Sequence, residues 1–67
     1  MNNIKVLDKY ITHKQAIDVI KAYFSLLGYC ININYAQLDS KQIQVIIDSL
    51  EDTILLECAL SETLENY

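Results

Sequence analysis

Two helix-start signatures divide this chain and constrain its fold more than any other feature. Thr12 is followed three residues later by Gln15, and Asp39 is followed three residues later by Gln42. In such a capping box the first side chain accepts a hydrogen bond from a first-turn amide, and the glutamine reaches back to the capping residue. The chain is therefore expected to contain two helices, each starting at one of these boxes.

The first predicted helix covers about residues 12–27 and stops at Gly28, the only glycine of the chain. Glycine readily takes the left-handed conformation that closes many helices. We expect Tyr23 and Leu27 to lie in the core. The apolar face is wide enough to pack against more than one neighbour. It consists of Ala16, Ile17, Val19, Ile20, Tyr23, Phe24, Leu26 and Leu27.

The second predicted helix covers about residues 40–65, and Leu38 and Ile43 are placed to form a hydrophobic staple at its start. The first half has a single apolar stripe, in which Ile47 is an expected core residue. This stripe consists of Ile43, Ile46, Ile47, Leu50 and Ile54. Further along, the positions that would continue this stripe hold the polar residues Glu57 and Ser61. The apolar side of the helix therefore rotates by nearly half a turn. The apolar residues on or beside the opposite face are Leu55, Leu56, Cys58, Ala59 and Leu60.

Two interpretations of this rotation follow. In one, the chain kinks near residues 52–53 and a third helix folds back onto the core. In the other, one straight helix presents its second half to another molecule. About 25 helical residues span about 38 Å, against about 24 Å for the first helix, so a straight helix would leave its last turns without a partner in its own chain.

The segment between the two helices alternates with period two, which is typical of extended chain. We expect an extended linker at residues 29–36 in a small all-α domain, either a helical hairpin or a three-helix domain. The alternative is an α+β fold with short strands at 3–7 and 30–35, paired through the first helix. Periodicity leaves the N-terminal segment open, because Ile4, Leu7 and Ile11 also fit a short helix.

The 67 residues predict one small domain, 1–67, in which 52% of the residues are hydrophobic. A domain of this size buries only about 60% of the surface of its unfolded chain. Small folds commonly gain stability from disulfides, a metal or association with another chain. The surplus of apolar side chains favours association, and we expect a homodimer or another homo-oligomer.

The N-terminal residues lack the apolar core of a signal peptide, and the longest uncharged stretch contains Gly28 and several amides. We therefore expect a cytoplasmic protein that does not bind membranes. In a reducing compartment Cys30 and Cys58 are expected to be buried free thiols. The abundance of Ile, Asn and Lys without Arg, Pro or Trp suggests an AT-rich coding sequence, as in many low-GC bacteria and their phages.

Charge is distributed unevenly along the chain. Residues 1–33 carry four lysines and two acids, whereas residues 34–67 carry Lys41 and seven acids. Nucleic-acid binding needs Lys and Arg to neutralise phosphates, so direct binding to nucleic acid is not expected. Asp48, Glu51 and Asp52 gather at helical spacing and are expected to form a solvated acidic face that could bind a basic partner.

No pattern in the sequence indicates catalysis, a cofactor or a metal site. His13 is expected to be an exposed residue in the first turn of a helix, and its spacing from Cys30 and Cys58 matches no zinc motif. The cysteines lie in apolar surroundings, which disfavour a reactive thiolate. The single glycine excludes a glycine-rich phosphate loop. We therefore expect a protein that is not an enzyme.

The remaining class is a small regulator or inhibitor that binds another protein through its helices, with a homodimer as the expected form. The alternative is a subunit or assembly chaperone that guards an apolar segment of another protein. Tyrosines beside the Ile-Asn alternation could add an amphipathic contact surface. The predicted partner-binding residues are Leu55, Leu56, Ala59, Leu60, Tyr29, Tyr35, Asp48, Glu51 and Asp52.

Overall fold

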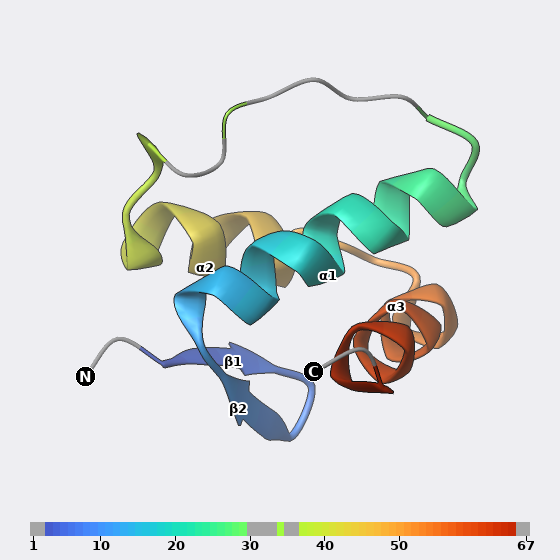
Figure 1. Cartoon of the computed structure of the whole chain (residues 1–67), viewed down its shortest axis with the longest axis horizontal. Helices are drawn as coiled ribbons and strands as arrows, with labels where there is room; N and C mark the ends of the chain where they lie inside the picture. Colours follow the sequence, from blue (N-terminus) through green and yellow to red (C-terminus); the bar gives the residue numbers. More distant parts are fainter. Residues whose placement is uncertain (1–2, 30–33, 35–36, 66–67) are drawn as a thin grey trace.

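A computed structural model describes residues 3–29, 34 and 37–65 of the chain. The described elements are strands β1 (Ile4–Val6) and β2 (Lys9–Ile11) and helices α1 (His13–Leu26), α2 (Ser40–Asp48) and α3 (Thr53–Glu65). Figure 1 shows α1 crossing above the β-hairpin, with α2 on one side and α3 on the other. No described helix is both long enough and apolar enough to cross a membrane.

The N-terminal segment forms an antiparallel hairpin, in which Ile4 pairs with Ile11 and Val6 pairs with Lys9. Ile4, Val6 and Ile11 point into the core because alternate strand residues share one face. The α+β interpretation therefore fits the chain better than the all-α one. Strand β1 pairs with β2, a strand that the sequence did not predict. The predicted strand at 30–35 lies outside the described residues except for Asn34, and the 29–36 linker is described only at its first residue and at Asn34.

Leu7 makes the two-residue hairpin turn with a positive φ of 58°. A leucine rarely takes this conformation, because its Cβ crowds the following carbonyl. Two-residue hairpin turns nevertheless need positive φ at one or both central positions. The hairpin therefore forms at some local cost, and it carries Leu7 outward beside α3.

Helix α1 begins as the sequence predicts, with both hydrogen bonds of the Thr12–Gln15 capping box present. It also ends as predicted, since Gly28 has a φ of 87°. The Tyr29 N–H donates to the Phe24 carbonyl at 2.9 Å and the Gly28 N–H to the Ser25 carbonyl at 3.0 Å, which together form a Schellman motif.

The face of α1 that packs into the core includes Tyr23, as predicted. The prediction that Leu27 is buried is wrong, because its side chain is 47% exposed. Helix α1 ends at Leu26, so Leu27 lies at the C-cap, past the last turn that packs against the other elements.

Helix α2 starts with the predicted capping box at Asp39 and Gln42 but ends at Asp48, so the single helix at about 40–65 is wrong. Ser49 donates its hydroxyl to the Ile46 carbonyl at 2.7 Å. Asp52 then starts α3, because its Oδ1 accepts from the Leu55 N–H at 3.0 Å. The interpretation with a kink near 52–53 and a third helix is confirmed.

The core lies between α1, the other two helices and the inner face of the hairpin. Helix α1 packs against both α2 and α3, and β1 packs against α1 and α2. Ile47 is buried, as predicted. The buried apolar residues are Ile4, Val6, Ile11, Ala16, Val19, Ile20, Tyr23, Ile43, Ile47, Leu56, Ala59 and Leu60.

Candidate functional site

The predicted apolar interface on the second half of the second helix does not exist as an exposed surface. Leu56, Ala59 and Leu60 are buried in the core of their own chain, and Leu55 is half-buried against it. The prediction that these side chains lack partners within the chain is wrong. Because the chain turns between α2 and α3, the rotated apolar face points inward against α1.

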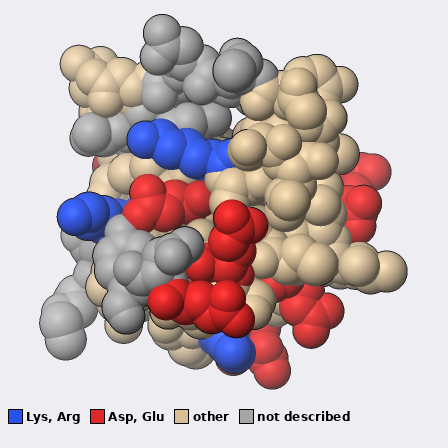
Figure 2. Space-filling view, turned by 45° about the vertical axis from the view of Figure 1, so that its right-hand side comes forward, with Lys and Arg blue, Asp and Glu red and all other residues tan. Residues whose placement is uncertain are grey.

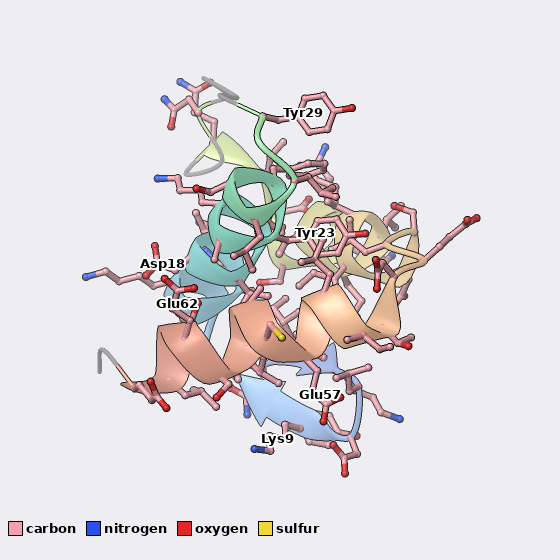
Figure 3. All side chains as sticks on the ribbon, turned by 90° about the vertical axis from the view of Figure 1, so that its right-hand side faces the viewer. Lys9, Asp18, Tyr23, Tyr29, Glu57 and Glu62 are labelled. Atoms are coloured by element: carbon pink, nitrogen blue, oxygen red, sulfur yellow. The ribbon has the colours of Figure 1, made fainter. Side chains whose placement is uncertain are left out.

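Of the two tyrosines predicted to bind a partner, Tyr29 is 63% exposed. It follows Gly28 at the end of α1, beside the exposed Leu26 and Leu27, and in Figure 3 its ring points away from the helices. Tyr35 lies outside the described residues. Tyr29 therefore remains available for contact with a partner.

Asp48, Glu51 and Asp52 are all exposed, as predicted, and two of them also have structural roles. The Oδ1 atom of Asp48 accepts a hydrogen bond from Gln44 Nε2 at 3.0 Å, and Asp52 caps α3. The described residues contain no group of three or more His, Cys, Asp or Glu side chains that could bind a metal ion. This stretch is thus a solvated connection between two helices.

Two expectations about single side chains need correction. His13 is half-buried rather than exposed, because its Nε2 donates to the Leu38 carbonyl at 3.0 Å and joins the start of α1 to the residues before α2. Cys58 is a free thiol, as expected, but it is exposed on α3 rather than buried. Cys30 lies outside the described residues.

A concave surface that the sequence did not predict lies between the hairpin turn and α3. This hairpin–α3 cleft has a volume of about 370 Å³. A second cavity of about 320 Å³ lies on the other side of Leu7, against α2 and the start of α3. The residues lining the hairpin–α3 cleft are Leu7, Asp8, Lys9, Glu57, Leu60, Ser61, Leu64 and Glu65.

The hairpin–α3 cleft combines an apolar floor with an acidic rim. Its carboxylates are Asp8, Glu57 and Glu65, and its one cationic group is Lys9. In Figure 3, Glu57 projects from α3 toward the hairpin, on which Lys9 lies. The apolar lining comes from the buried Leu60, the half-buried Leu64 and the 37% exposed Leu7.

Further acidic side chains lie near the same helix. Figure 3 shows Asp18 of α1 and Glu62 of α3 pointing toward one another. In Figure 2, Asp and Glu side chains gather in the middle of the face shown and along its right and lower edges, and lysine side chains lie beside them. This part of the surface therefore favours a positively charged partner over a negatively charged one.

The sequence contained a signal for this cleft. Glu57 and Ser61 interrupt the apolar stripe when the phase of the preceding helix is extended through them, and Glu65 follows four residues later. Residues four apart share a helix face, so these three side chains form one polar row on α3. Their partner across the cleft, the hairpin turn, could not be identified without knowing where β2 lies.

Comparison of the chain with protein-family models, with curated proteins and with solved structures gives no significant match.

Proposed function

We propose that this chain is a small cytoplasmic regulator or inhibitor that acts by binding another protein through α3 and the β-hairpin. The observation that carries the proposal is the hairpin–α3 cleft, an open concavity of about 370 Å³ that is lined by both leucine and charged side chains. Protein interfaces commonly combine an apolar centre with a polar rim. A surface of this composition suits contact with a protein segment.

Exposed apolar side chains at the start of α3 and after the end of α1 support the same class of function. Ile54 in the first turn of α3 is 74% exposed, and Tyr29 extends from the end of α1. Aromatic residues are enriched at protein interfaces because they bury a large area at a small entropic cost. Ile54 lies on the helix that lines the cleft and would extend a contact made there, whereas Tyr29 lies at the opposite end of the molecule from the hairpin (Figure 3) and would serve a separate contact.

A homodimer remains a prediction, although it no longer has its predicted surface, because Leu56, Ala59 and Leu60 pack within the chain. A second copy would have to use other apolar side chains. The outer face of α2 offers Leu38, Val45 and Ile46 around a groove of about 330 Å³. Sedimentation equilibrium of the purified chain would determine the oligomeric state.

Affinity purification from the native host, followed by reconstitution with each purified candidate partner, tests the proposed function. An Ile43→Asp variant, with a charge at a fully buried position, controls for capture by an unfolded chain. We expect a partner that binds the folded chain in a saturable manner and changes its activity on binding. A partner that instead aggregates without this chain would support an assembly chaperone. Recovery of the same proteins by the parent chain and by the Ile43→Asp variant would contradict the proposal.

A further inference from the structure

We infer that the hairpin–α3 cleft receives a basic amphipathic helix of the partner, with two Lys or Arg residues eight positions apart and an aliphatic residue midway between them. This inference rests on the proposed function and specifies the chemistry of the partner. It follows from the charge of the cleft, from the spacing of its polar row and from the side chains on its floor.

The charge of the cleft sets the sign of the partner. Three carboxylates, on Asp8, Glu57 and Glu65, face one ammonium group, on Lys9, so the lining carries an excess of negative charge. Because these carboxylates belong to no group that could bind a metal ion within the described residues, a single cation is not the expected ligand. Several cationic groups on one partner segment would match them better.

The spacing on α3 sets the spacing on the partner. Glu57 and Glu65 are eight residues apart on one helix, which places them about 12 Å apart along its axis. A partner helix lying along α3 repeats this distance when its basic residues are also eight positions apart. Residues at intervals of four lie on one face, so the midway residue points toward the cleft as well.

The middle of the cleft sets the chemistry of that midway residue. Ser61 lies between the two glutamates and has a small side chain, which leaves room for a larger one from the partner. The adjoining floor consists of Leu60 and Leu64, with Leu7 on the hairpin side. An aliphatic side chain buries apolar area there, whereas a polar one would lose hydrogen bonds to water.

The test uses three synthetic helical peptides of about 17 residues, long enough for measurable helicity in water. The first has lysines eight positions apart and a leucine midway, the second replaces the lysines with glutamates, and the third replaces the leucine with serine. Binding to the full chain is followed by chemical-shift changes of its backbone amides. We expect saturable binding of the first peptide alone, with the largest shifts at Leu7–Lys9 and at Glu57–Glu65.

Charge variants of the chain test the inference further, because some should weaken peptide binding and one should strengthen it. Glu57→Lys and Glu65→Lys should each weaken binding of the first peptide by about tenfold, since an attraction becomes a repulsion. Lys9→Ala should strengthen it by about twofold. Glu51→Lys is the matched control, because it makes the same change in net charge at an exposed site outside the cleft, and its effect should stay below about twofold.

The outcomes separate this inference from the proposed function. Equal weakening by Glu51→Lys and Glu57→Lys, equal binding of the glutamate or serine peptide, or no saturation at about 1 mM peptide would overturn the inference. A native partner that slows amide exchange at the hairpin turn and α3, but binds the Glu57→Lys and Glu65→Lys variants with unchanged affinity, would also overturn it while leaving the proposed function intact. Failure to recover any specific native partner contradicts the proposed function itself.

Discussion

The side-chain amide of Gln44 binds both backbone groups of Lys5. Its Oε1 accepts from the Lys5 N–H at 2.8 Å, and its Nε2 donates to the Lys5 carbonyl at 2.8 Å. Unpaired backbone groups on an edge strand can pair with another chain. The two Lys5 groups lie on the edge of β1 that faces away from β2. By bonding to both of them, Gln44 joins the hairpin to α2.

Replacing Gln44 with alanine should therefore loosen the hairpin. Loss of these two exposed hydrogen bonds, together with the one from Gln44 Nε2 to Asp48 Oδ1, should lower the free energy of unfolding by about 1 to 2 kcal/mol. Amide exchange at Lys5 should become faster, which hydrogen exchange followed by NMR would measure. Lys41→Ala, at an exposed site on the same helix, is the control and should change stability by less than about 0.5 kcal/mol. Unchanged exchange at Lys5 in the Gln44 variant would argue against this coupling.

A second prediction concerns the start of α3. Asp52→Ala removes the acceptor for the Leu55 N–H and should destabilise the chain by about 1 kcal/mol. Asp52→Asn retains an acceptor and should stay within a few tenths of a kcal/mol of the parent. Chemical denaturation of both variants measures the difference. Equal loss in the two would show that the charge of Asp52, rather than its capping bond, supports α3.

The helix starts were predictable because each is specified by residues within one turn. The break at residues 49–52 was left open, since the connection contains neither glycine nor proline. Its signals were Ser49, which bonds back to the Ile46 carbonyl, and Asp52, which caps forward. Both residues also fit the exposed face of a continuous helix, so the pattern alone could not choose. Burial of Leu56, Ala59 and Leu60 against α1 favours the break over a continuous helix, because a continuous helix would leave these side chains exposed.

The hairpin was harder to predict for a different reason. Ile4, Leu7 and Ile11 are spaced as on a helix, and the turn lacks the glycine or asparagine that normally marks two-residue hairpins. Leu7 takes the positive φ instead, and the residue type gives no indication of this, because leucine rarely adopts such a conformation. Without the hairpin, the acidic residues of α3 had no opposite wall, and the cleft could not be inferred.

The third prediction uses this turn. Leu7→Asn should keep or raise stability, because asparagine takes positive φ more readily than leucine. Leu7→Val should lower the free energy of unfolding by about 1 to 2 kcal/mol, since a β-branched residue fits this conformation poorly. Thermal unfolding of the two variants tests the contrast. A valine variant as stable as the asparagine variant would show that the turn is not strained.

The fourth prediction separates the two faces of α3. Leu56→Glu places a charge in the core and should unfold a domain whose total stability is about 3 to 5 kcal/mol. Ile54→Glu, two residues earlier, changes a 74% exposed side chain and should leave the fold intact. Circular dichroism compares them. A folded Leu56→Glu chain that only loses self-association would instead support the interface first predicted from the sequence.

The most direct test of protein binding through the hairpin–α3 cleft is hydrogen–deuterium exchange of the chain with and without its native partner. We predict that the partner slows exchange at Leu7–Lys9 and along Glu57–Glu65, with little change on the outer face of α2. Slower exchange confined to residues around Leu38, Val45 and Ile46, with the hairpin turn and α3 unchanged, would contradict the account.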